Sequence, residues 1–360
     1  MSEAPTQSKP SSSSPAGGRA GGGGPLGADS PEPSVSPELP EAPINSSASS
    51  ITGKATRPGD RIFSSLASGS AIFVTVLIGA IGVFLIWRAI PALSRNEVNF
   101  LTSNVWKTEN INAMLFGVRD LFLVTMLVSF FALLLAMPIA LGIAIFLTEY
   151  SPKQLKKPLA YVIDLLAAVP SIVYGLWGLL VFAPVIRPVA VWLNDHLSWI
   201  FLVKTGSGSV AGGGTIFTAG IVLAVMILPV ITAVTREVFT QTPTAHIEAA
   251  LALGATRWEV VKTTVIPFGK SGYISGSMLG LGRALGETMA LYLILRTTAQ
   301  SFSGSLFDGG ATIASKIALG YAEFNNSTQA GAYIAVGLVL FVLTFVVNAT
   351  ARAAVAGKKH

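Results

Sequence analysis

The sequence predicts an all-α membrane protein that crosses the bilayer six times. Its 360 residues are 51% hydrophobic and only 12% charged, and its mean hydropathy is +0.64. Soluble domains carry about 25% charged residues. Several uncharged runs reach the roughly 20 residues that a helix needs to cross about 30 Å of hydrocarbon. Composition and run length together therefore indicate a polytopic membrane protein.

The composition also excludes several classes of function. The net charge of +6 arises from Lys and Arg that gather between the apolar runs, as topology signals do, so it does not indicate nucleic-acid binding. The chain has no cysteine, which excludes disulfides, thiolate metal sites and cysteine nucleophiles. Its three histidines are scattered. We expect a non-catalytic protein in membrane lipid, with no metal site and no cofactor bound by this chain.

The first 60 residues differ in composition from everything that follows. Ser, Pro and Gly make up more than half of residues 1–60, so this segment cannot bury a core. The glycine run at residues 21–24 is not followed by Gly-Lys-Ser, and we interpret it as linker and not as a phosphate loop. The segment is expected to be a disordered cytoplasmic tail.

Six spans are expected between residues 61 and 352, which form the transmembrane domain. They lie at about residues 62–87, 121–148, 165–186, 215–235, 271–295 and 330–350. The first run is too long for a signal-peptide core, so we interpret it as a retained anchor. Pro138 and Pro170 are expected to kink their spans, which membrane helices tolerate. Residues 187–214 are expected to form an outer loop with one interfacial helix.

The distribution of positive charge sets the expected orientation. With the N-terminus inside, the cytoplasmic segments hold 15 of the 24 Lys and Arg residues, against eight outside and one in the membrane. Positive residues favour the cytoplasmic side. Both termini, including a short C-terminal tail at residues 353–360, are therefore expected in the cytoplasm.

The fifth span, residues 271–295, carries two full charges, Arg283 and Glu287. A charge near the bilayer centre costs roughly 2.5–3.5 kcal/mol even on lenient insertion scales, so such residues usually have a functional reason. On one continuous helix the two charges share a face with three glycines spaced for close helix packing: Gly272, Gly276 and Gly280. We interpret Arg283 and Glu287 as lining a route for an anion. The alternative is a pair that neutralises itself and only fixes helix packing.

The cytoplasmic segment at residues 236–270 contains the most specific pattern in the chain. It consists of Glu248, Ala249, Ala250, Gly254 and Pro267. This pattern resembles the EAA loop of ABC-type importer permeases, which implies a short coupling helix that docks on a cytoplasmic ATPase. The local chemistry agrees, because Ala and Leu favour helix and glycine permits a tight turn after it.

The same segment ends in a sequence that suggests nucleotide binding but fails the pattern. Gly269, Lys270 and Ser271 match the end of a P-loop, yet Thr264 stands where that pattern needs glycine and Pro267 interrupts it. The chain is therefore not expected to bind ATP. ATP and Mg are expected on a partner ATPase.

Beyond this loop, residues 62–350 resemble the PstC-type permeases of bacterial phosphate-specific ABC transporters. The resemblance is carried by residues 142–149, 168–178, 228–237, 248–259 and 280–290. It implies a permease that forms half of a translocation path in the bacterial cytoplasmic membrane, with Arg283 and Glu287 acting in phosphate translocation. The implied partners are a second, PstA-type permease subunit, PstB-type ATPase subunits and an extracytoplasmic, PstS-type phosphate-binding protein.

Two alternatives remain open from the residues themselves. An Arg recognises tetrahedral oxyanions in general, so molybdate or sulfate could replace phosphate as the cargo. A secondary transporter or channel would also place charges inside a span, but it would not need the docking pattern at residues 248–254.

Overall fold

The computed structural model describes residues 58–204, 213–297, 302–323 and 326–356. The chain divides into a unit of residues 1–63, of which only the start of the first helix is described, and a unit of residues 64–360. The tail expected over residues 1–60 thus lies almost wholly outside the described residues.

Among the described residues, the regular secondary structure is helical apart from one short strand pair. The α-helices are α1 (Pro58–Leu93), α2 (Arg119–Ile145), α3 (Lys153–Ala167), α4 (Ser171–Trp177), α5 (Ala183–Leu197), α6 (Ile216–Thr240), α7 (Thr244–Ala252), α8 (Arg257–Val260), α9 (Ile266–Leu285), α10 (Met289–Ile294), α11 (Ile313–Leu319) and α12 (Ser327–Ala356). Single π-helical turns follow α2, α4 and α8 at Phe146–Tyr150, Gly178–Phe182 and Val261–Val265, and a 3-10 turn follows α11 at Gly320–Glu323. Strand β1 (Trp106–Lys107) pairs antiparallel with β2 (Leu115–Phe116).

The expected all-α membrane fold is confirmed. In the described part of the chain, five helices are long and apolar enough to cross a membrane: Ile62–Leu93, Arg119–Tyr150, Ser171–Leu197, Ile216–Thr240 and Ser327–Ala353. They correspond to five of the six expected spans. The expected fifth span, residues 271–295, is not among them.

Helix α6 forms the centre of the bundle. Of its most apolar 18-residue window, 72% is buried, whereas no residue of the corresponding window of α1 is buried. α6 packs most extensively against α2 and α9. Its start is capped by Thr215, whose hydroxyl accepts the Thr218 N–H at 3.4 Å. A helix that is apolar on all sides is expected at the core of such a bundle.

The third span differs from the expectation in both of its boundaries. The helix that contains Leu165 and Leu166 is α3, which has a Lys-rich start and no buried residue, and it ends at Ala167. Pro170 does not kink a continuous span. It precedes the first residue of α4, where a missing N–H has no cost. The chain then stays helical from Ser171 to Leu197, so residues 187–197 of the expected outer loop are helix.

The fifth span differs because its helix is interrupted. α9 ends at Leu285, Gly286 leaves the helix, and α10 begins at Met289. The coupling segment expected at residues 236–270 is also shorter, because α6 runs to Thr240 and α9 starts at Ile266. Glycine, serine and the charges Lys270 and Arg283 lower the hydropathy of α9. A helix of this composition suits a position between other helices better than one in lipid.

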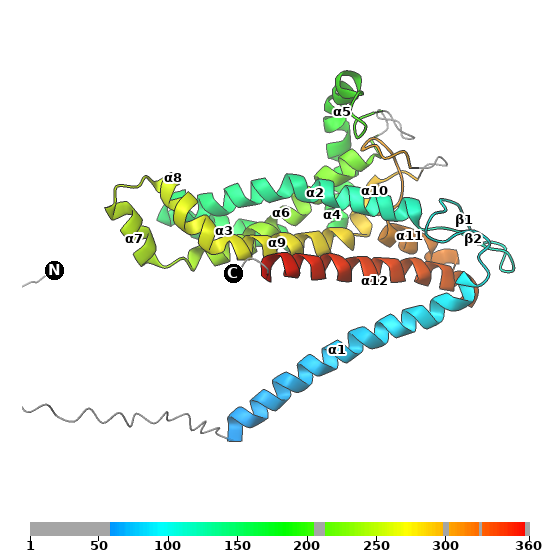
Figure 1. Cartoon of the computed structure of the whole chain (residues 1–360). Helices are drawn as coiled ribbons and strands as arrows, with labels where there is room; N and C mark the ends of the chain where they lie inside the picture. The colour runs from blue at the N-terminus through cyan, green and yellow to red at the C-terminus, as the bar shows by residue number, and fades with distance from the viewer. Residues whose placement is uncertain (1–57, 205–212, 298–301, 324–325, 357–360) are drawn as a thin grey trace, which may run out of the picture. The chain divides into compact units, whose positions relative to one another are not determined.

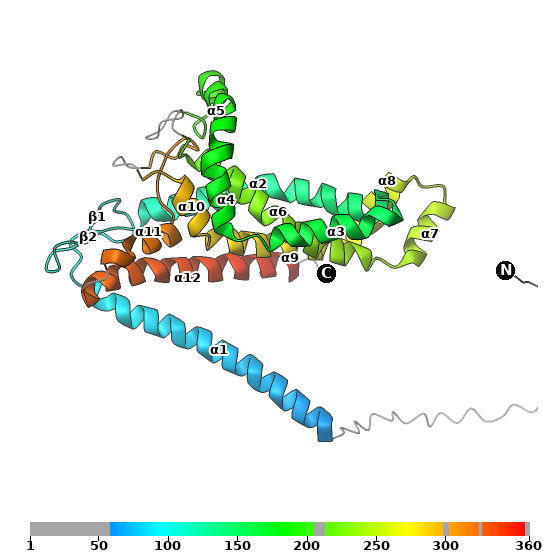
Figure 2. The ribbon, with the colours of Figure 1, turned by 180° about the vertical axis from the view of Figure 1, so that it is seen from behind.

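The two ends of the helical bundle carry different structures. Helices α7 and α8 lie at one end, and β1, β2 and α11 lie at the other (Figure 1). The view from behind shows the same separation, and shows α4 continuing into α5, which projects from the bundle (Figure 2). The end that carries α7 and α8 and the end that carries β1, β2 and α11 are therefore separated by the length of the bundle.

Substitution of Gly280 tests the packing of α9 on α6. An added Cβ at Gly280 would lie 2.8 Å from Ile231 Cγ1, whereas one at Gly282 would meet nothing within 4 Å. We expect Gly280→Val to destabilise the protein by about 1–3 kcal/mol, the usual cost of overpacking a core. A lower melting temperature of the purified protein measures it. Gly282→Ala is the matched control, and equal melting of the two variants would contradict this packing.

Candidate functional site

Arg283 lies in a groove between α6, α9 and α12. The groove has a volume of about 460 Å³ and is lined by Val230, Met278, Leu279, Gly282, Arg283 and Asn348. Arg283 is half-buried, and among the described residues no carboxylate lies within ion-pair distance of its guanidinium. The guanidinium does lie within electrostatic range of the Tyr174 hydroxyl in α4. Arg283 therefore lines this groove with a guanidinium that carries five N–H donors and has no carboxylate in ion-pair distance among the described residues.

Glu287 occupies a different environment from the one expected. The expectation placed it one turn beyond Arg283 on the same helix, able to form an ion pair. The interruption at Gly286 removes that register, and no Arg283–Glu287 ion pair forms. The Glu287 side chain is 7% exposed, and its Oε1 accepts the backbone N–H of Ala290 at 3.1 Å. The carboxylate thus caps the first turn of α10, where a negative charge is favourable.

The three glycines of α9 face α6 of the same chain. Added Cβ atoms would lie 2.4 Å from Val238 at Gly272, 3.1 Å from Val234 at Gly276 and 2.8 Å from Ile231 at Gly280. The absence of side chains lets the two backbones approach closely. The glycine face of α9 is therefore covered by α6 of the same chain.

The coupling segment forms an exposed helix and turn. Glu248 and Ala249 are exposed and Ala250 is half-buried, all within α7. Gly254 follows with a φ of +86° and open space around it, so the turn uses a backbone conformation that other residues adopt only with strain. The N–H of Ala255 returns to the Ala250 carbonyl oxygen at 3.1 Å, which closes this turn. The result is a fixed helical projection beyond the bundle.

A capping box fixes the direction of α8 after this turn. The Thr256 hydroxyl accepts the Glu259 N–H, and the Glu259 carboxylate accepts the Thr256 N–H at 2.7 Å. These hydrogen bonds from the backbone and side chain of Thr256 lower the pKa of Glu259 below its ordinary value of 4.5. Glu259 therefore remains charged at neutral pH, and the capping box fixes the start of α8 directly after the Gly254 turn.

The described residues form neither a phosphate-binding loop nor a metal site. Gly269, Lys270 and Ser271 lie inside α9 and form no loop that could surround a phosphate group. Within the described ranges, no three His, Asp or Glu side chains gather closely enough to hold a metal ion. The group at this site that could bind an anion is the Arg283 guanidinium.

Two features of the site were missed in the sequence. Leu253 is 89% exposed and Trp258 is 57% exposed, so the coupling projection presents apolar side chains beside Glu248. Apolar residues in the connection between two spans could have indicated this, because they have no core there to join. The second is Tyr174 in α4, which lies five helices before the Arg283 helix α9 in chain order and could be placed only by the fold.

Comparison with known proteins agrees with these features. Residues 136–359 match the family described as "Binding-protein-dependent transport system inner membrane component". The chain is 56% identical over 302 residues to the phosphate transport system permease protein PstC 2 of Mycobacterium tuberculosis, covering 84% of this chain and 93% of that protein. It is 55% identical over 303 residues to PstC of Mycobacterium leprae, covering 84% and 95%. An inward-facing structure of the MetNI methionine ABC transporter aligns with 68% of this chain and 96% of that chain at 17% identity and a TM-score of 0.47.

The bundle with the exposed helix α7 is thus a membrane permease of the binding-protein-dependent class. Within this class, the chain belongs to the PstC family of phosphate transport system permeases.

Proposed function

We propose that the chain is the membrane-spanning permease subunit of an ATP-driven phosphate importer and forms half of its translocation path. The observation that carries this proposal is the half-buried Arg283 guanidinium, which faces a groove and has no carboxylate partner among the described residues. A buried charge left unpaired is costly unless a ligand uses it. The phosphate transport named for the mycobacterial relatives supports phosphate as that ligand.

The chemistry of the cargo explains why a guanidinium is needed. Phosphate must lose water to cross the membrane, so the path must offer donors in place of hydration. A planar guanidinium donates to two phosphate oxygens at once. Because Arg283 lies in an open groove rather than a closed cavity, the other wall of the path comes from a PstA-type permease subunit.

Energy and substrate come from further partners in this proposal. The projection at α7 docks on PstB-type ATPase subunits, which bind ATP and Mg, and a PstS-type protein delivers phosphate on the opposite side. Both termini of the chain are cytoplasmic and the membrane is the bacterial cytoplasmic membrane. This orientation follows from the excess of Lys and Arg in the segments on the α7 side.

Uptake of labelled phosphate tests the proposal directly. Cells that lack the gene are expected to lose high-affinity uptake and to regain it with the gene. Unlabelled phosphate should compete, whereas molybdate and sulfate should not. Competition by molybdate or sulfate alone would assign the other oxyanion as cargo, and unchanged uptake in the deletion strain would refute the proposal.

Two substitutions of Glu287 separate its capping role from a role in transport. We propose that its negative charge competes with phosphate near Arg283 and keeps binding weak enough for release. Glu287→Gln retains an oxygen that can accept the Ala290 N–H, so assembly should be normal while uptake falls several-fold. Glu287→Ala also loses the cap, at about 1 kcal/mol, and should lower the amount of assembled complex. Normal uptake by Glu287→Gln would leave only the capping role.

A further inference from the structure

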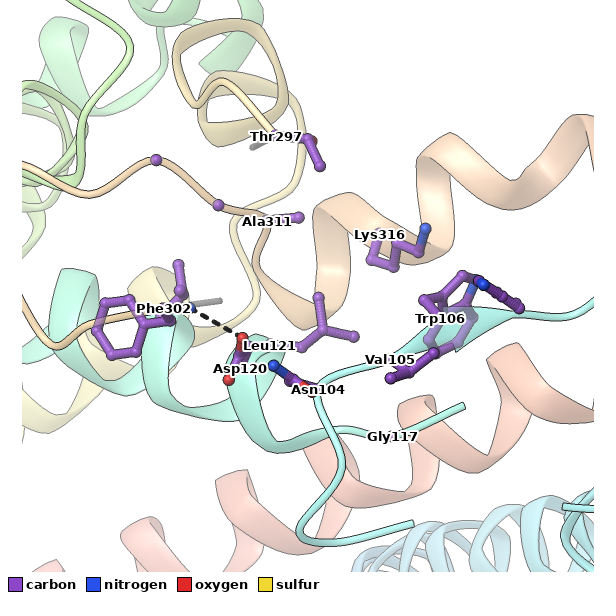
Figure 3. A pocket seen from close by; sticks show the side chains of 14 residues that line it. Asn104, Val105, Trp106, Gly117, Asp120, Leu121, Thr297, Phe302, Ala311 and Lys316 are labelled. Carbon is purple, nitrogen blue, oxygen red and sulfur yellow. Dashed lines mark hydrogen bonds between the residues drawn. The ribbon is translucent and has the colours of Figure 1, made fainter. Parts of the chain in front are cut away.

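A second cavity lies at the end of the bundle opposite α7 and shares no lining residue with the Arg283 groove. It has a volume of about 390 Å³ and is bounded by β1, the first turn of α2, the segment at residues 302–311 and α11 (Figure 3). In the orientation proposed above, this end faces the side from which phosphate arrives.

The charges around the cavity favour an anion. Three of its lining residues are ionisable, namely Lys107, Lys316 and Asp120. The Lys316 ammonium lies 4.9 Å from the centre of the Trp106 ring, which orients it at the wall of the cavity. Two ammonium groups against one carboxylate leave a net positive charge in a partly enclosed space, where electrostatic attraction is stronger than in water.

Two buried polar atoms of the lining lack hydrogen-bond partners among the described residues. Asp120 Oδ2 accepts the backbone N–H of Phe302 at 3.0 Å, but Asp120 Oδ1 is buried without a donor. The indole Nε1 of Trp106 is buried without an acceptor. Buried polar groups are nearly always hydrogen-bonded, so a bound group that supplies both partners is expected here. The cavity thus presents positive charge, one unused donor and one unused acceptor.

These requirements select a particular chemistry. The ligand must be anionic, must accept hydrogen bonds from Trp106 and the lysines, and must itself donate one to Asp120 Oδ1. Hydrogen phosphate meets all three conditions, because one of its oxygens carries a proton at neutral pH. Sulfate and molybdate are fully deprotonated there and would place an oxygen lone pair against the carboxylate. A phospholipid phosphodiester also lacks the proton.

We propose that this cavity is an entry site for protonated tetrahedral oxyanions, in which Asp120 selects phosphate over sulfate. The proposal deepens the phosphate-import function and rests on it for the cargo. It adds a selective step at the mouth of the permease, before the anion reaches Arg283.

Protection of the pocket lysines from acetylation measures occupancy of this site alone. The purified complex that contains this chain is treated with an amine-reactive reagent, and modification of Lys107 and Lys316 is followed by mass spectrometry. Phosphate and arsenate, which both carry a proton, should slow modification of Lys316 several-fold. Sulfate, molybdate and dimethyl phosphate, the last a probe for lipid headgroups, should not. Lys153 on α3 is exposed and distant, and its rate should stay constant.

The outcomes distinguish this site from the function on which it rests. In Asp120→Asn, sulfate should protect Lys316 as well as phosphate does. The native complex alone can overturn the proposal. It does so if phosphate fails to protect Lys316, or if sulfate protects Lys316 equally well. Arg283→Gln should abolish uptake and leave protection intact. Protection lost with normal phosphate uptake would refute only the entry site, whereas absence of phosphate uptake by the native complex would refute the import function.

Discussion

Arg283→Gln is expected to abolish phosphate uptake while the complex still assembles. The guanidinium is half-buried in the groove and forms no ion pair within the described residues, so its removal breaks no internal salt bridge. Charge-assisted hydrogen bonds are worth about 1.5–3 kcal/mol each, so loss of a bidentate contact lowers transport by on the order of 100-fold or more. Labelled-phosphate uptake and co-purification of the other subunits are the two measurements.

Arg283→Lys separates geometry from charge at the same position. Lysine keeps the positive charge but cannot donate from a planar fork, so uptake should recover only in part. If Arg283→Gln instead prevented assembly, Arg283 would be a packing residue, as in the alternative considered from the sequence. Normal uptake by Arg283→Gln would contradict both interpretations.

The sequence marks Arg283 and Glu287 as unusual charges, but the expected geometry between them is wrong. The expected pairing assumed that residues 271–295 form one helix. Gly286 ends α9 directly before Glu287, and the Glu287 carboxylate accepts the backbone N–H of Ala290 in α10. Residues four apart share a face of a helix only if the helix is continuous between them. Whether a helix continues past a glycine depends on tertiary packing as well as on local propensity. Here α10 packs against Gly175 of α4, which no local pattern reveals.

The coupling segment was more predictable because its structure is local. Gly254, Thr256 and Glu259 form a turn and a capping box within six residues, and each has a strong intrinsic preference for its role. The entry cavity is the opposite case. Asp120 and Phe302 meet across 182 positions in the chain, so only the assembled fold brings them together.

Leu253→Asp is expected to uncouple the permease from ATP hydrolysis. Leu253 is 89% exposed at the tip of the α7 projection, beside Glu248 and the Gly254 turn, and it has no core to enter within this chain. Burial of a leucine side chain contributes about 1.5–3 kcal/mol, which makes Leu253 suited to anchor the projection in a groove of the ATPase. A buried aspartate there would cost more than the lost contact. Binding of the ATPase should weaken by about 100-fold.

The measurements for Leu253→Asp are ATPase co-purification and ATP-driven phosphate uptake in vesicles, both of which should fall together. Leu253→Met is the matched control, because it keeps the apolar volume and should behave like the native chain. Replacement of residues 248–254 by a neutral linker should reproduce the loss. Since α7 is exposed and contributes no buried residue to the bundle, neither change should unfold the transmembrane helices. Unchanged uptake in both Leu253→Asp and the linker variant would show that uptake does not need an ATPase bound at α7. That result would favour a secondary transporter.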